Sequence, residues 1–132
     1  MSKYLSREAI LAMEDRTYQD CRIKEWGGMV RVQSLTGTER DQWEAACQEE
    51  KGGEKKFTTD KLREKLLSFC LVDAEGNKLF SEGDIALLAG KNAAALTRLF
   101  TVASKLNGIG AQDVEELTKN SEAAPSGDSI SV

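Results

Sequence analysis

The stretch Leu71–Gly108, LVDAEGNKLFSEGDIALLAGKNAAALTRLFTVASKLNG, contains a tight turn followed by two helix patterns, and the remaining segments are expected to cover it. Small and polar residues at 73–77 tolerate the backbone angles of a turn, and an apolar pair stands on either side of them. Over residues 93–106 apolar side chains recur at steps of three and four, which predicts an amphipathic helix capped by Asn92. Its apolar stripe consists of Leu96, Leu99, Phe100, Ala103 and Leu106.

A shorter helix is predicted between the turn and this longer helix. Ser81 and Asp84 have the spacing of a capping box, and Gly90 is expected to end the short helix in a left-handed conformation. In the longer helix, Phe100 stands at the centre of the stripe. We expect its ring to be buried, so that truncation to alanine destabilises the fold by about 3 to 5 kcal/mol.

The composition excludes several classes of function. The chain has 132 residues, a size typical of one domain, and its 18 basic and 22 acidic side chains give a net charge of −4. No block of lysine and arginine is dense enough to follow a phosphate backbone. No apolar run matches a signal peptide or approaches the roughly 18 residues of a membrane span. We therefore expect a cytosolic protein with no nucleic-acid and no membrane partner.

The residues of common catalytic and metal sites are scarce. The chain has no histidine, which removes the commonest general base and the commonest metal ligand. Cys21, Cys47 and Cys70 are odd in number and widely spaced, so they are expected to be buried side chains rather than disulfides or metal ligands. No glycine-rich phosphate-binding motif is present either. We expect a non-catalytic protein that holds no cofactor and no metal.

Two patterns stand before residue 36. Ser6 is expected to cap a short helix with an apolar edge, which is too short to be stable alone and should pack on another part of the protein. Extended runs at 17–24 and 29–35 then predict a β-hairpin between about Tyr18 and Leu35.

The tip of this hairpin is the candidate partner-binding site, with Trp26 and Met29 as its residues. A large ring beside two glycines is harder to bury than one in a helix, which favours contact with a partner. The alternative is that the ring of Trp26 folds back onto the sheet, because tryptophan occurs both in cores and in interfaces.

The middle of the chain is predicted to be helical, with one break. A helix is expected to start at Thr38 and run to about residue 51, with Trp43 facing inward, and the apolar-free segment 52–56 should be an exposed, mobile linker. Thr59 is expected to begin the next helix. Residues 68–72 fit either the end of that helix or a strand leading into the turn.

The end of the chain adds one more helix and a tail. A short helix is predicted over residues 111–120, while 121–132 has too few apolar side chains to offset its ordering entropy and should be disordered. Together these patterns predict a mainly α fold: one small helical domain over residues 1–120, one short β-hairpin, and the disordered tail 121–132.

The turn also partly matches a calcium-binding loop. Asp73, Asn77 and Asp84 stand at its first, fifth and twelfth positions, with Glu75 and Ser81 at the third and ninth. The sixth position, which needs glycine, is Lys78, and an aspartate replaces the usual bidentate glutamate. An EF-hand-like, calcium-responsive helical module is therefore an alternative function, although we expect no calcium binding tighter than millimolar.

Several short signatures occur in a distinctive order. They are WGG at 26–28, LTG at 35–37, ERD at 39–41, LVD at 71–73, Gly76 with LF at 79–80, NG at 107–108, EEL at 115–117 and KN at 119–120. By their order and spacing, the chain between about Trp26 and Asn120 resembles the tail assembly chaperones of long-tailed, siphovirus-type bacteriophages.

The resemblance implies a non-catalytic protein in the cytoplasm of the infected host. Its partners would be the tape measure protein and the tail-tube protein, with a homo-oligomer as a further expectation, and its role would be to promote assembly of the tail tube. A longer product made by ribosomal frameshifting is also implied. A small regulator or adaptor without a ligand is the third interpretation.

Overall fold

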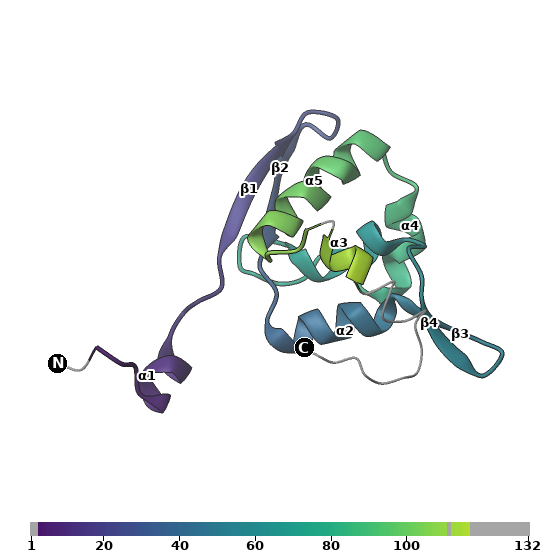
Figure 1. Cartoon of the computed structure of the whole chain (residues 1–132). Helices are drawn as coiled ribbons and strands as arrows, with labels where there is room; N and C mark the ends of the chain where they lie inside the picture. Colours follow the sequence, from purple (N-terminus) through teal and green to yellow (C-terminus); the bar gives the residue numbers. More distant parts are fainter. Residues whose placement is uncertain (1–2, 111, 117–132) are drawn as a thin grey trace.

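A three-stranded antiparallel sheet lies against a group of helices in the computed structural model, which describes residues 3–110 and 112–116 (Figure 1). The strands are β1 (Tyr18–Ile23), β2 (Gly28–Gln33) and β5 (Leu71–Val72), in the order β1-β2-β5. The predicted hairpin is therefore confirmed, and β5 is added to its β2 edge.

Side chains alternate between the two faces of the hairpin. Ile23 and Val32 are buried, whereas Met29 is exposed. The backbone turn between the strands requires glycine at position 27, where φ is 71°. The buried face of the hairpin packs on α5 (Ala93–Leu106).

Three helices of the body pack around α3 (Leu62–Cys70). It packs on α2 (Gly37–Ala46), on α4 (Ile85–Ala89) and on α5. A single 3-10 turn, η1 (Glu82–Asp84), precedes α4. The largest fully buried side chains of the core come from these helices and from the sheet: Trp43, Ile23, Leu66, Leu67, Leu71, Leu96, Leu99 and Val32.

The helix starts in the Leu71–Gly108 stretch are confirmed. The Asn92 side-chain oxygen accepts a hydrogen bond from the Ala95 backbone N–H at 3.0 Å. Asp84 Oδ2 accepts from both the backbone N–H and the hydroxyl of Ser81, at 3.0 and 3.1 Å. The left-handed end predicted at Gly90 is wrong, because φ there is −81°, and the Gly90 backbone N–H donates to the Leu87 carbonyl at 3.1 Å.

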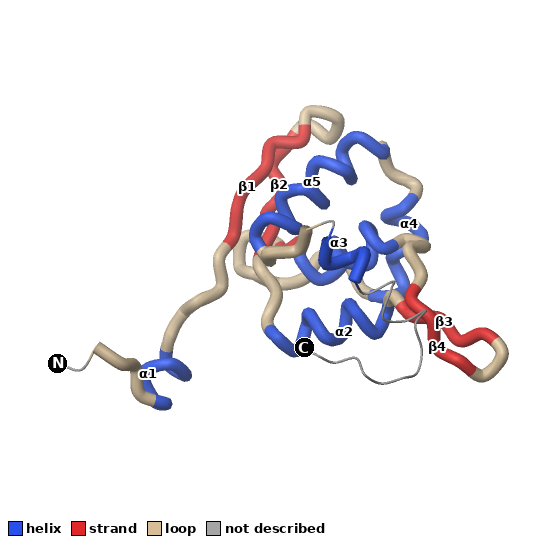
Figure 2. The backbone as a smooth tube through the Cα atoms, in the orientation of Figure 1, coloured by secondary structure: helices blue, strands red, loops and turns tan. Residues whose placement is uncertain are grey.

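The predicted mainly α fold is wrong. Of the residues that the structure describes, 46% are helical and 20% are in strands, and the strands form two sheets, which makes this an α+β fold. The second sheet is a hairpin of β3 (Gln48–Lys51) and β4 (Glu54–Phe57), which occupies the end of the predicted helix and the predicted linker. Figure 2 shows this hairpin in red, projecting from the body on the side away from α1.

Two features explain this second hairpin. Gly52 and Gly53 have φ values of 60° and 83°, and a two-residue loop with both residues at positive φ matches the twist of paired strands. The strands also pair opposite charges, with Glu49 facing Lys56 and Glu50 facing Lys55. A segment without an inward apolar face can therefore form a hairpin.

Other boundaries in this region also differ from prediction. Thr36 rather than Thr38 caps α2, since its hydroxyl accepts from the Glu39 backbone N–H at 3.1 Å. The next helix begins at Leu62, after Lys61 with a left-handed φ of 53°, rather than at Thr59. Residues 68–72 contain both of the structures considered, because α3 ends at 70 and β5 starts at 71.

Contrary to the prediction from the apolar stripe, the buried side of α5 is not centred on Phe100. Leu96 and Leu99 are fully buried, whereas Phe100 is only partly buried at the edge of the cluster. The smaller residues Ala95 and Ala103 are buried in its place. The expected cost of truncating Phe100 must therefore be lowered.

The N-terminal arm differs most from prediction. Ser6 caps α1 (Arg7–Ala12) as expected, accepting a hydrogen bond from the Ala9 backbone N–H at 3.0 Å, but α1 has no buried residue. Figure 1 shows it standing away from the body. The expectation that this helix packs on another part of the protein is not met within the described chain.

At the other end, residues 112–116 are helical, as predicted for 111–120. The predicted disordered tail, 121–132, lies outside the described residues. Within the described part of the chain, no helix is both long and apolar enough to cross a membrane.

Candidate functional site

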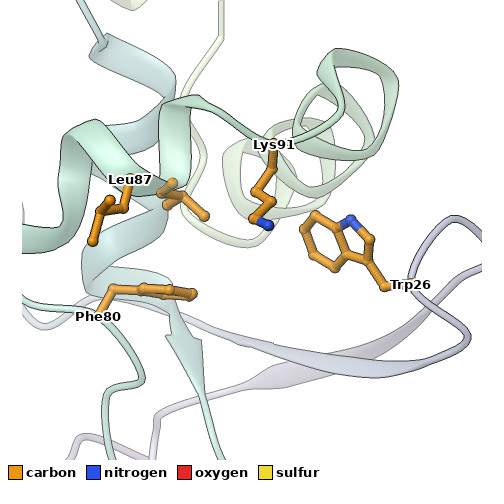
Figure 3. A pocket seen from close by; sticks show the side chains of 5 residues that line it. Trp26, Phe80, Leu87 and Lys91 are labelled. Carbon is orange, nitrogen blue, oxygen red and sulfur yellow. The ribbon is translucent and has the colours of Figure 1, made fainter.

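An apolar pocket of about 250 Å³ opens between the tip of the β1–β2 hairpin and α4 (Figure 3). Its wall is formed by Trp26, Phe80, Leu87, Leu88 and Lys91. Leu88 is buried, but Leu87 is 71% and Trp26 38% exposed, so two large apolar side chains border the opening. A concave apolar surface with exposed large side chains at its rim is a candidate binding site.

Backbone hydrogen bonds order the hairpin tip at Trp26. The backbone N–H groups of Trp26 and Gly27 both donate to the Ile23 carbonyl, at 3.0 and 2.9 Å. The neighbouring Glu25 accepts a hydrogen bond from Arg98 of α5 and forms an ion pair with it. This hydrogen bond lowers the pKa of Glu25, so the tip is tied to α5 by a charged pair at neutral pH.

The opposite wall of the pocket comes from α4 and the residues on either side of it. In this five-residue helix, Leu87 and Leu88 are adjacent and point in different directions, so Leu88 enters the core and Leu87 remains outside. Lys91 follows the helix, and its side chain points toward Trp26 (Figure 3). In the described part of the chain the Lys91 ammonium has no partner.

The two predicted partner-binding residues do not share this pocket. Trp26 lines it, but Met29 does not, and its side chain is 60% exposed on β2. Met29 pairs in register with Arg22 on the strand opposite. Their role in partner binding therefore stays a prediction, and only Trp26 has a concave surface beside it.

Sequence reasoning missed the other residues of the pocket: Phe80, Leu87, Leu88 and Lys91. One signal was present, because two adjacent leucines in so short a helix cannot both face the core. Their proximity to Trp26 had no local signal, since more than fifty residues separate them along the chain.

A larger and more polar groove adjoins the pocket at Phe80. It runs between α2, α3 and the segment before α4, with a volume of about 810 Å³. Two basic residues line it, Lys65 and Lys78, and the ammonium of Lys78 is already engaged, 3.2 Å from Glu39 and 4.6 Å from the centre of the Phe69 ring. The smaller pocket is therefore the better candidate for apolar binding.

The cysteines do not provide a reactive thiolate. Burial raises the pKa of Cys47 to about 11 and that of Cys70 to about 12. Both thiols are therefore neutral at physiological pH, and the prediction that they are buried side chains is confirmed. Cys21 is only partly buried, and burial raises the pKa of its thiol too.

Asp73, the first position of the calcium-loop alternative, is used within the turn. Asp73 Oδ1 accepts hydrogen bonds from the backbone N–H groups of Glu75 and Asn77, each at 2.9 Å. The Asn77 backbone hydrogen bond is the main reason that the pKa of Asp73 is lowered. No cluster of three or more histidine, cysteine, aspartate or glutamate side chains placed for a metal occurs among the described residues. A calorimetric titration with calcium remains the test of this alternative.

Comparison with known proteins gives a family and a fold. Residues 6–120 match the family described as phage tail assembly chaperone. Among solved structures, the tail assembly chaperone of bacteriophage HK97 is similar, with a TM-score of 0.54 and 16% identity over 79% of this chain and 93% of that chain. No curated protein matches.

Proposed function

Because this chain belongs to the phage tail assembly chaperone family, which confirms the resemblance seen in the sequence, we propose that it binds an apolar helical segment of the tape measure protein. In this role it shields that segment in the host cytoplasm while the tail-tube protein assembles. It acts by binding alone and without catalysis.

The single observation that supports this proposal is the pocket beside Trp26. One face of an amphipathic helix presents apolar side chains at steps of three and four, and such anchors fit shallow apolar grooves. Trp26 and Leu87 stand on opposite sides of the opening, where they can contact one anchor from both sides. Lys91 at the rim favours a bound tape measure helix, the client, that has an acidic residue beside its apolar face.

Binding of purified tape measure segments tests the proposal. Leu87→Glu and Trp26→Ala should each weaken binding by about 2 kcal/mol or more, as expected when an interface anchor is removed, and should change the melting temperature of the monomer, measured at low protein concentration, little. Leu79→Glu is the matched control, because Leu79 is 49% exposed but lies outside this pocket. Unchanged binding by both pocket variants would exclude the pocket as the client site.

Met29 needs a separate measurement because it lies outside the pocket. If the client also covers the outer face of the hairpin, Met29→Ala should weaken binding while leaving the melting temperature unchanged. Binding equal to wild type would restrict the client site to the pocket.

A further inference from the structure

The N-terminal arm, residues 3–15, presents exposed apolar side chains in α1 and on either side of it. Ile10 and Leu11 of α1 are 54% and 67% exposed, and Leu5 and Met13 on either side are also exposed. A six-residue helix is too short to be stable in water without packing, so a covering surface is required. We therefore expect the arm to bind an apolar surface that covers these side chains.

Arg16 and Thr17 tie the base of the arm to the body. The Arg16 guanidinium donates to the Ser34 carbonyl at 2.9 Å and forms an ion pair with Glu39 at 3.1 Å. The Thr17 backbone N–H donates to the Ser34 hydroxyl at 3.0 Å. These contacts hold the base of the arm beside the end of β2, and α1 projects from there.

This anchor places the apolar pocket out of reach of the same chain's helix. The four backbone steps from Ala12 to Arg16 span at most about 14 Å. The pocket's Trp26 stands at the far end of β1, a six-residue strand that spans about 20 Å. Figure 1 agrees, since α1 and α4 lie on opposite sides of the molecule.

We propose that the arm of one copy docks in the Trp26–Leu87 pocket of a second copy. Both surfaces are apolar, and both are exposed in the single chain. Their charges are complementary as well: Glu14 and Asp15 follow the apolar edge of the arm, and neither they nor Lys91 at the pocket rim have a partner within the described residues. Docking in a second copy brings these acids near that ammonium.

This contact has a consequence that rests on the proposed function. If the same pocket holds the tape measure segment, the arm of a neighbouring copy and the client compete for it. The arm then keeps the pocket covered until the client is present, which protects an apolar surface from nonspecific association.

Mixing two variants tests the contact between copies. Sedimentation should show a dimer or larger assembly for the wild type. The arm variant carries both Ile10→Lys and Leu11→Lys, and the pocket variant carries Leu87→Glu. Each of these two variants alone should sediment as a monomer of 14.5 kDa. In an equimolar mixture, the intact arm of one variant meets the intact pocket of the other, so assembly should return. Circular dichroism confirms that each variant is folded, and Leu79→Glu should assemble as the wild type does.

A charge reversal gives an independent result. Lys91→Glu should weaken self-association by at least about tenfold in dissociation constant, and Glu14→Lys with Asp15→Lys should restore it. A monomeric wild type at all concentrations, an arm variant that assembles normally, or a mixture that stays monomeric would each overturn the proposal.

The two proposals fail separately. The arm variant should bind the tape measure segment at least as tightly as the wild type, because its pocket is intact and uncovered. Normal assembly of the arm variant refutes the contact between copies, whatever the client does. Normal client binding by both Leu87→Glu and Trp26→Ala refutes the client site, whatever the oligomeric state.

Discussion

Helices α1 and α5 both begin at a capping side chain and both carry apolar residues on one side, but only α5 buries them. Asn92 caps α5, and Leu96 and Leu99 of that helix are fully buried against the sheet and α3. Ser6 caps α1 with the same kind of hydrogen bond, and its apolar side chains remain in solvent. The two helices differ in their packing partners: α5 lies against the sheet and α3, whereas no part of the described chain buries a residue of α1.

The comparison separates two contributions to a helix. Capping and spacing determine where a helix begins and which side is apolar, whereas packing supplies most of its stability. Helix α5 has both contributions within one chain. Helix α1 has only the first, and in our proposal a second copy supplies the other.

The largest effect is expected at the centre of α5. Leu99→Ala should lower the free energy of unfolding by about 2 to 5 kcal/mol, because it removes buried methyl groups and leaves a cavity. Urea denaturation monitored by circular dichroism measures this loss. A loss under about 1 kcal/mol would mean that α5 packs no better than α1 does.

Phe100→Ala should have a smaller effect on the same helix. The ring is only partly buried, so we expect a loss of about 1 to 2 kcal/mol in the same denaturation experiment. A loss as large as that of Leu99→Ala would restore the original prediction that Phe100 lies at the centre of the core.

The two caps should differ although their hydrogen bonds are alike. Asn92→Ala should lower the free energy of unfolding by about 1 kcal/mol, while Ser6→Ala should leave the global transition unchanged, because α1 unfolds independently of the body. Thermal melting of both variants at low protein concentration gives the comparison. Equal losses would show that α1 is coupled to the core.

The smallest effect on stability is expected in α1. Leu11→Ala should change the free energy of unfolding of the monomer by less than about 0.5 kcal/mol, since the side chain contacts solvent. In an assembled sample the same variant should lower the melting temperature, because association stabilises the folded state by mass action. Denaturation at two protein concentrations distinguishes these cases, and identical behaviour at both would argue against a covered arm.

Some features could be predicted because their causes lie close together in the sequence. The cap at Asn92 involves residues three positions apart, and the stripe of α5 repeats every three or four. The hairpin at residues 18–33 follows from two extended runs joined by glycines. The order of short signatures between 26 and 120 was enough to identify the family.

The β3–β4 hairpin marks the limit of that approach. Its strands have no apolar alternation, and their pairing depends on charges that face one another across the turn, such as Glu50 and Lys55. A search for apolar patterns therefore assigned these residues to a helix and a linker. The two glycines at 52 and 53 were the one local signal, since both adopt the positive φ of a two-residue hairpin loop.

The sequence by itself determined where most elements begin, which side of each is apolar, and the family. Only the tertiary structure decided which apolar residues are covered: Leu99 rather than Phe100 on α5, and none on α1. It also brought Trp26 beside Leu87 and Lys91. Burial and pocket formation depend on contacts between segments far apart in the chain. Short-range sequence periodicity does not specify which of those segments pack together.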